Sequence, residues 1–362
     1  MAVQKVDIIK FLELAKTHPI FDVRSPGEYH KAHIPGAISL PLFSDEERKV
    51  VGTAYKQQSR ELAIKIGLDY FGPKMRGVVE TVEKILEQQQ LAKEPTAEAA
   101  SKIVLVHCWR GGMRSGAIAW LLDLYGFKVY SLAGGYKKFR NWIIEAFTYT
   151  YPLQILGGYT GSGKTYVIQA LQQQNHHVID LEGLAMHKGS AFGSIGLPPQ
   201  PSQEMFENLL GLELHKIHQG EDLQPIWVED ESQRIGLVNI PPPLWISMRT
   251  SPVYYLDIPF EERLKHIVAE YGSLDQQRML DAISRIQKRL GGLETKLAMQ
   301  NLQEGDVAGA FRILLKYYDK WYEKGLQNRE NLNELLKRIP CNKVDAIENM
   351  HLLLDKYDER IN

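Results

Sequence analysis

A cysteine, Cys108, stands where a protein chain can make a thiol reactive. It follows the apolar run Ile103 to Val106, which predicts a buried parallel strand, and helical spacing of apolar residues begins soon afterwards. The loop Trp109 to Arg114 should therefore join a strand to a helix N-terminus, where backbone N–H groups and the helix dipole favour an anion. Because Arg110 and Arg114 add positive charge, we expect a nucleophilic thiolate rather than a small buried apolar residue.

A second group of residues that could do chemistry spans Gly158 to Thr165. A strand predicted over 153–156 precedes it, and a helix predicted over 165–174 follows. Its sequence, Gly-Tyr-Thr-Gly-Ser-Gly-Lys-Thr, fits every position of the phosphate-binding loop pattern, in which glycines let amides approach phosphate, lysine supplies charge and threonine can hold magnesium. We assign phosphate binding to Gly158, Gly161, Ser162, Gly163, Lys164 and Thr165.

Two further stretches could complete a phosphate site. The apolar run 225–228 ends in acidic residues, of which Glu229 or Asp230 could orient magnesium or act as a base, and Arg234 could contact phosphate; the alternative is a solvated acidic turn. The Gly-rich, basic loop 187–193 has few apolar anchors, so we expect a mobile surface connection whose polar groups could close over a ligand. Its candidate contact residues are His187, Lys188 and Ser190.

Composition indicates an ordinary soluble chain with room for two domains. Of 362 residues, 44% are hydrophobic and 24% charged, and the net charge of −1 gives no global attraction to nucleic acid, so such a partner would need local patches. The two cysteines cannot form a disulfide framework or a zinc site by themselves, and we assign no metal ligand. With no signal segment and no apolar run near the ~18 residues needed to span a bilayer, we expect a cytoplasmic protein without a membrane partner.

Alternating strands and helices predict parallel sheets covered by helices, in domains over 1–148 and 149–362. In the first domain we expect helices over 6–14, 44–58 and 59–90, strands over 19–23, 103–106 and 128–132, a loop over 93–100, and helices beginning at Gly116 and Gly134. In the second domain we expect a strand over 253–256, after which helices dominate to the end.

The cysteine loop fits two enzyme classes. His-Cys-x-x-Gly-x-x-Arg-Ser over 107–115 is the signature of cysteine phosphatases, in which loop amides hold phosphate and the thiolate attacks phosphorus. Rhodanese-like sulfurtransferases use the same strand, loop and helix to carry sulfur or selenium. The upstream segments 22–29, 33–37 and 40–41 closely resemble those that precede the active-site loop in rhodanese domains, and no phosphatase-type aspartic general acid stands out. The loop is one residue longer than in ordinary sulfurtransferases, which suits a larger or phosphate-bearing donor.

Near the C-terminus, the stretches 285–292 and 311–322 mix cations with aromatic rings, a composition that can hold single-stranded RNA. For the second stretch we slightly favour an aromatic face buried in the core. The tetrapeptide 342–345, Asn-Lys-Val-Asp, matches a guanine-recognition motif, but no strand is predicted before it and it lies far along the chain from the phosphate loop, so we interpret it as coincidence. Cys341 beside it should be an incidental structural thiol.

Together, these segments resemble one family, the tRNA 2-selenouridine synthases, over nearly the whole chain. The resemblance rests on residues 22–41, 107–115, 158–165, 187–193 and 229–234. It implies a rhodanese-like parallel-sheet domain followed by a P-loop NTPase-like α/β domain with a helical C-terminal region. It also implies a transferase that acts on the wobble 2-thiouridine of tRNA, adding a geranyl group from geranyl diphosphate to sulfur and then replacing S-geranyl with selenium from selenophosphate.

The resemblance gives the candidate residues their roles. Cys108 would attack selenophosphate or accept its selenium while Arg110 and Arg114 neutralise the phosphate, and the loop around Lys164 would hold the diphosphate of the prenyl donor. We expect no tightly bound cofactor, magnesium at Thr165 as an option, and a monomer. Two alternatives stay open: a sulfurtransferase fused to a small-molecule kinase or ATPase, and a cysteine phosphatase or noncatalytic phosphate-binding adaptor.

Overall fold

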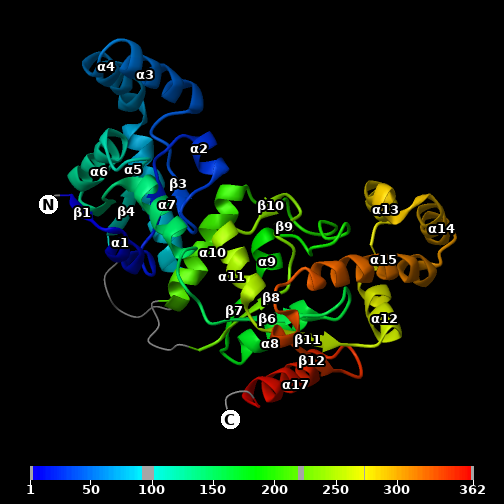
Figure 1. The fold of residues 1–362 in the computed structure, drawn as a ribbon. Coiled ribbons are helices and arrows are strands. Elements are labelled where there is room, and N and C mark those ends of the chain that lie inside the picture. The colour runs from blue at the N-terminus through cyan, green and yellow to red at the C-terminus, as the bar shows by residue number, and fades with distance from the viewer. Residues whose placement is uncertain (1–2, 92–101, 219–223, 273, 360–362) are drawn as a thin grey trace. The chain divides into compact units, whose positions relative to one another are not determined.

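The computed structural model describes residues 3–91, 102–218, 224–272 and 274–359, and these fold into two units, Met1–Glu145 and Ala146–Asn362 (Figure 1). Each unit is built on its own five-stranded parallel sheet. The α/β class, with a rhodanese-like unit followed by a P-loop-like unit, is confirmed. In the part of the chain that is described, no helix combines the length and the apolar character needed to cross a membrane.

The sheet of the first unit places Cys108 at the carboxyl end of a central strand. Its strand order is β1-β5-β4-β2-β3, and apolar side chains of the inner strands are fully buried because helices cover both faces. The strands are β1 (Gln4–Val6), β2 (Ile20–Asp22), β3 (Ile38–Ser39), β4 (Ile103–His107) and β5 (Lys128–Leu132).

The first unit has more helices than the five that the sequence predicts. They are α1 (Ile8–Ala15), α2 (Pro26–Lys31), α3 (Asp45–Gln57), α4 (Arg60–Phe71), the short 3₁₀ helix η1 (Gly72–Lys74), α5 (Met75–Leu91), α6 (Met113–Tyr125) and α7 (Gly135–Ala146). The run predicted as one helix over 59–90 is broken at η1, where Pro73 lacks the N–H that a helix interior needs. Val6 belongs to a strand, and α6 begins three residues before Gly116. The loop predicted over 93–100 lies outside the described residues.

The second unit places the phosphate loop at the end of the middle strand of its sheet. The strand order is β12-β11-β6-β8-β7, all parallel, with a separate antiparallel pair β9–β10. The strands are β6 (Leu153–Gly157), β7 (His177–Ile179), β8 (Ile226–Glu229), β9 (Arg234–Ile235), β10 (Val238–Asn239), β11 (Val253–Asp257) and β12 (Leu336–Pro340).

Helices of the second unit pack in two groups. One group covers the sheet, and the other, α12 to α15, builds a helical core of its own beside it, in which α13 and α14 lie on one side of α15 and α12 on the other (Figure 1). The helices are α8 (Lys164–Gln173), α9 (Leu181–Ala185), α10 (Gln203–His218), α11 (Pro242–Thr250), α12 (Phe260–Tyr271), α13 (Gln276–Leu290), α14 (Gly292–Gln303), α15 (Val307–Gln327), α16 (Leu332–Leu335) and α17 (Ala346–Asp358).

Strand β12 is the main element that the sequence did not predict. It pairs in parallel with β11 along its whole length and directly precedes the tetrapeptide 342–345, so the absence of a strand is no longer an argument against that motif. Asp345 nevertheless has a structural task, because its carboxylate accepts the N–H groups of Ile347 and Glu348 at the start of α17. The side chain of Val344 packs against Gly163 of the phosphate loop.

Candidate functional site

The cysteine loop of the first unit is shaped by two glycine turns. Cys108 directly follows β4 and is 3% exposed. Gly111 has a positive φ of 62°, and a β-carbon there would lie 2.5 Å from the Leu132 carbonyl oxygen. Across the loop, a β-carbon on Gly135 would lie 2.3 Å from the Cys108 carbonyl oxygen. That carbonyl instead accepts the Tyr136 N–H at 2.8 Å, which fixes the cysteine backbone against the start of α7.

Hydrogen bonds favour the ionised form of the Cys108 thiol. Burial opposes ionisation, but the Ser115 hydroxyl and the backbone N–H groups of Ser115, Gly112 and Arg110 together hold the pKa of Cys108 below its ordinary value. The sulfur and the Ser115 Oγ are 3.2 Å apart. The thiolate is thus supported by amides and a hydroxyl at a helix N-terminus, as expected from the strand–loop–helix arrangement.

The two arginines of the loop differ in their surroundings. Arg114 lies in the first turn of α6 and pairs with Glu28, with Nη1 and Oε2 2.5 Å apart. Burial acts against the ionised Glu28 carboxyl, but this guanidinium holds the pKa of Glu28 below its usual value. Arg110 is exposed, and among the described residues it forms no ion pair. Arg110 is therefore the arginine whose charge is available to an incoming anion, while Arg114 ties the loop to α2.

A buried ion pair between Arg24 and Asp22 supports the cysteine loop. The Arg24 guanidinium forms a bidentate pair with Asp22, donates to the Ala32 carbonyl oxygen at 2.7 Å, and stacks 3.9 Å from the centre of the Tyr136 ring. His107 lies beside Asp22, yet burial lowers the pKa of His107 to about 4, so the imidazole is neutral at physiological pH. His107 is a structural neighbour of the cysteine rather than its acid or base.

The phosphate loop of the second unit has the expected strand, loop and helix. Gly158, Gly161 and Gly163 all have positive φ, which only glycine adopts without strain, and α8 begins at Lys164. The Lys164 Nζ donates to the Gly158 carbonyl oxygen at 2.9 Å. Ser162 is buried, and its hydroxyl has no hydrogen-bond partner among the described residues. The structure therefore brings together all six residues that the sequence assigned to phosphate binding.

Side chains from α12 and α15 hold this loop in place. The Tyr322 hydroxyl accepts the Gly158 N–H at 3.0 Å and donates to Asp230 at 2.8 Å. Arg263, buried on α12, donates to the Thr160 carbonyl oxygen at 3.0 Å and pairs with Asp319. The helical region therefore belongs to the site, because it fixes the backbone that would face a phosphate.

Three carboxylic acids gather behind the loop. The Thr165 hydroxyl donates to Glu182 at 3.1 Å. Glu229, at the end of β8, is fully buried, and neither of its oxygens has a hydrogen-bond partner among the described residues. Burial, reinforced by the neighbouring charge of Glu182, raises the pKa of Glu229 to about 8, and burial also raises the pKa of Glu231 and of Glu182. At neutral pH this cluster of three carboxyl groups is therefore not fully ionised.

The other acidic and basic candidates have different environments. Asp230 pairs with buried Arg329, whose Nη2 is 2.5 Å from its carboxylate, and also accepts the Tyr322 hydroxyl, so it is committed to holding the fold. Arg234 lies on β9, is exposed, and donates to the Gly236 carbonyl oxygen at 2.9 Å, with no contact to the phosphate loop among its described hydrogen bonds. Of these three candidates, Glu229 alone faces Thr165 and Lys164.

The basic loop 187–193 is anchored, contrary to the expectation of a mobile connection. Phe192 is 2% exposed and packs against Tyr271 and Phe311 in the helical core. Lys188 pairs with Glu270, and the Ser190 hydroxyl accepts the Phe192 N–H at 3.2 Å. His187 is almost fully buried, and burial lowers its pKa. The Phe192 side chain and the Lys188–Glu270 pair attach the loop, although the sequence has few apolar residues there.

Sequence reasoning missed Glu182, Tyr322, Arg263 and Glu28. Glu182 had a weak signal, since Asp180 and Glu182 follow a short apolar strand as the acids after β8 do. Tyr322 and Arg263 had no sequence signal for this role, because both act through contacts with segments more than a hundred residues away. Among the described residues, no group of three or more His, Cys, Asp or Glu is arranged to hold a metal ion.

Comparisons with known proteins match both units. The family described as the tRNA 2-selenouridine synthase AAA domain matches residues 151–344, and the rhodanese-like domain family matches residues 7–141. A tRNA 2-selenouridine synthase of Bdellovibrio bacteriovorus is 34% identical over 343 residues, which cover 85% of this chain and 86% of the relative. A tRNA 2-selenouridine synthase of Sulfurovum sp. is 33% identical over 362 residues, covering 91% and 93%. The chain therefore belongs to the tRNA 2-selenouridine synthase family.

Proposed function

We propose that this transferase, a tRNA 2-selenouridine synthase, uses its two phosphate-adapted loops for two successive reactions on one nucleoside. The phosphate loop of the second unit would serve S-geranylation of wobble 2-thiouridine by geranyl diphosphate. The cysteine loop of the first unit would serve replacement of the S-geranyl group by selenium from selenophosphate. The observation that carries the proposal is that each unit has, at the carboxyl end of a central parallel strand, its own Gly-rich loop before a helix N-terminus, a geometry that suits an anion.

In the first reaction, the sulfur of 2-thiouridine attacks C1 of the geranyl group. A C–S bond forms, the C–O bond to diphosphate breaks, and the nucleoside loses its N3 proton. The departing diphosphate would be stabilised by the amides of Gly161 and Gly163 and by the charge of Lys164. This assignment explains how a nucleotide-type loop can act without hydrolysing ATP.

Magnesium fits the donors behind this loop. Mg²⁺ prefers oxygen ligands, and it often combines one or two carboxylates with substrate phosphates. The Thr165 hydroxyl and the carboxyls of Glu182 and Glu229 are such donors, and the unpartnered oxygens of Glu229 are consistent with a role in binding a cation. A bound Mg²⁺ would supply charge neutralisation to the diphosphate. Because Glu229 is fully buried, we assign it to magnesium binding rather than to contact with RNA.

In the second reaction, the Cys108 thiolate attacks the phosphorus of selenophosphate. An S–P bond forms and the P–Se bond breaks, so the electron pair leaves on selenium as hydrogen selenide. The loop amides and exposed Arg110 would hold the phosphate portion, and water later returns it as inorganic phosphate. The selenide then adds to C2 of the S-geranylated base, and the geranylated sulfur departs as geranyl thiol. The geranylated sulfur is a better leaving group than an unmodified thione sulfur. Oxidation states of selenium and phosphorus do not change.

Mass spectrometry of nucleosides from 2-thiouridine tRNA tests this scheme. Incubated with both donors, the full chain should yield 2-selenouridine. Cys108→Ser should stop at S-geranyl-2-thiouridine. Lys164→Ala should slow geranylation, which is the earlier of the two steps. Loss of both products in Cys108→Ser would show that the two centres are not separate, and an unchanged geranylation rate in Lys164→Ala would refute the role of the phosphate loop. ATP turnover without any change in tRNA would favour a fused kinase instead.

A further inference from the structure

Helices α13 and α15 carry an exposed aromatic surface flanked by cations. We define the α13/α15 surface by Arg289, Tyr317, Trp321 and Lys324. Trp321 is 43% exposed, whereas the core-facing side of α15 is formed by buried Phe311 and its aliphatic neighbours. The expectation that the aromatic residues of this stretch are core therefore holds for Phe311 but not for Trp321.

The cations lie close to the indole ring. The Arg289 guanidinium is 5.9 Å from the centre of the Trp321 ring, and the Lys324 Nζ is 5.2 Å from it. The centre of the Tyr317 ring lies 6.4 Å from that of Trp321, and the two ring planes are inclined at 63°. A face of aromatic rings bordered by positive charge matches a nucleobase with its adjoining phosphates.

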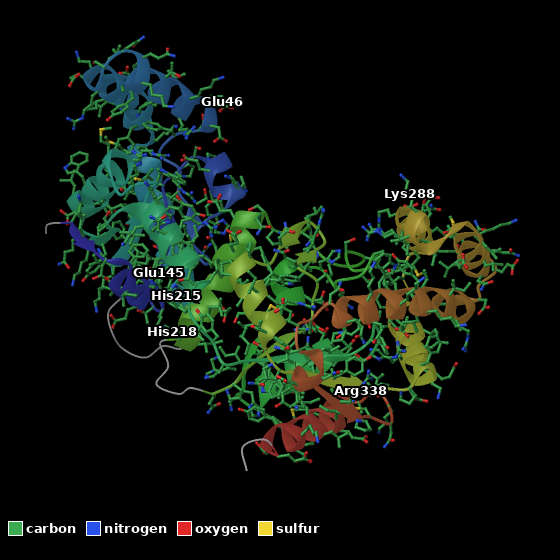
Figure 2. All side chains as sticks on the ribbon, viewed as in Figure 1. Glu46, Glu145, His215, His218, Lys288 and Arg338 are labelled. Carbon is green, nitrogen blue, oxygen red and sulfur yellow. The ribbon has the colours of Figure 1, made fainter. Side chains whose placement is uncertain are left out.

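These cations are not neutralised within the described parts of the chain. Neither Arg289 nor Lys324 forms an ion pair there, and Lys288, labelled in Figure 2, projects outward from the same helix α13. Of the nearby acids, Asp319 pairs with Arg263, whereas Glu323 accepts the neutral Tyr159 hydroxyl at 3.0 Å, so its carboxylate offsets one of the three cations. The surface therefore has a local positive charge that the net charge of the chain does not reveal.

Helix α15 links this surface to the phosphate loop. Trp321 is followed directly by Tyr322, whose hydroxyl accepts the Gly158 N–H. Successive residues of a helix point in different directions, so one face of α15 contacts the phosphate loop while another is exposed. A ligand on Trp321 would therefore lie on the same turn of α15 that contacts the phosphate loop.

We propose that the α13/α15 surface binds single-stranded RNA of the tRNA substrate, with one base stacked on Trp321 and the adjoining phosphates paired with Arg289 and Lys324. The inference rests on the proposed function, because it places the anticodon loop beside the site of prenyl transfer. RNA recognition through unpaired loops relies on such aromatic stacking, and the phosphate contacts add affinity without requiring a net basic protein.

Fluorescence anisotropy with a labelled anticodon stem-loop RNA that carries uridine at the wobble position measures this binding without any chemistry. Stacking on an aromatic side chain contributes enough that Trp321→Ala should raise Kd about tenfold or more, whereas Trp321→Phe should retain most of the affinity. Trp120→Ala is the matched control, because Trp120 is 53% exposed on α6 of the other unit and should leave Kd unchanged. Binding of geranyl diphosphate alone should be unaffected by Trp321→Ala.

Salt dependence tests the cations separately. Each lost contact to a single-strand phosphate should lower the slope of log K against log salt by about 0.7, so Arg289→Gln with Lys324→Gln should lower it by roughly twice that. Lys356→Gln, on α17, removes a positive charge elsewhere in the same unit, where Lys356 pairs with Glu359, and should not change the slope. Wild-type affinity in Trp321→Ala would overturn the proposed surface. Failure of the unmutated protein to bind the RNA, or any 2-thiouridine tRNA, would overturn the proposed function instead.

Discussion

The two cysteines of this chain show how strongly the surroundings of a residue decide its chemistry. Cys108 and Cys341 are both buried, but only Cys108 receives hydrogen bonds from amides at a helix N-terminus. At Cys341, burial and the nearby carboxylates of Asp257 and Glu348 raise the pKa to about 11. The same side chain is thus poised for reaction in one unit and inert in the other, as the sequence suggested from flanking residues alone.

Alkylation should separate these two thiols. Because Cys108 has a lowered pKa, its rate of modification by iodoacetamide should reach half its plateau at a lower pH than that of a free thiol, while Cys341 reacts only at much higher pH. Ser115→Ala removes the hydroxyl 3.2 Å from the sulfur and should move the Cys108 midpoint upward. Peptide mass spectrometry after timed labelling at a series of pH values measures both sites at once. Equal midpoints for the two cysteines would contradict the assignment.

Glu229 should make stability depend on alkaline pH. Its pKa rises from 4.5 in the unfolded chain to about 8 in the folded protein, so the folded state binds the extra proton between these values. Stability from this group is complete below about 4.5 and is lost as pH rises through 8. Glu229→Gln should therefore flatten the decline of unfolding free energy over that window. Urea titrations at several pH values test this, with Glu213→Gln on α10, where that side chain is 41% exposed, as control. A parallel decline in wild type and Glu229→Gln would refute it.

At the residue scale, the sequence revealed which residues are reactive but not which are paired with each other. The loop around Cys108 and the six phosphate-loop residues were predictable because each motif is contiguous. The ion pairs Glu28–Arg114 and Asp230–Arg329 join positions 86 and 99 residues apart, so no local sequence pattern predicts them. That is why Asp230 looked as good a candidate as Glu229.

At the scale of elements, the cysteine loop depends on the turn that begins α7. Gly135 has a φ of 59°, and a β-carbon there would also meet the Gly111 N at 2.5 Å, so two turns from different parts of the chain fit together only without side chains. The turn therefore positions the thiol although no residue of it takes part in the reaction.

Gly135→Ala should disturb this arrangement. The added methyl group meets backbone atoms that cannot move freely, and the backbone conformation is unfavourable for alanine, so we expect a loss of at least about 1 kcal/mol in unfolding free energy and slower labelling of Cys108. Gly116→Ala is the matched control: it lies within α6 with open space around it and should be neutral or stabilising by up to about 1 kcal/mol. Thermal unfolding and thiol labelling would refute the idea if both variants behaved alike.

Strands were easier to predict than the ends of helices. The runs 128–132 and 153–156 are apolar enough to mark buried strands, and the structure places them there. β12, with the sequence Leu-Lys-Arg-Ile-Pro, contains two cations and a proline, because it is an edge strand that needs only one apolar face. Its partner β11 is distant in sequence, so the pairing that makes it a strand was invisible.

At the scale of the whole molecule, each unit has its own sheet and hydrophobic core, and each carries one candidate loop. The proposed intermediate, S-geranylated tRNA, is a covalently modified macromolecule that can dissociate from the protein. Nothing in the chemistry requires that both steps take place on one chain. The two activities should therefore be separable by mutation and able to act in trans.

Mixing two full-length variants, each defective in one of the two reactions, tests that separation. Cys108→Ser should make S-geranylated tRNA, and Lys164→Ala keeps the cysteine loop, so together they should form 2-selenouridine after a lag in which the intermediate accumulates. The rate should rise with the concentration of Lys164→Ala, because the intermediate must find a second molecule. The control replaces Lys164→Ala with the double variant that also carries Cys108→Ser, which should leave the reaction at the geranylated stage. If the mixture forms no 2-selenouridine while both variants bind tRNA normally, the intermediate does not leave the chain that made it, and the two loops must act within a single bound complex.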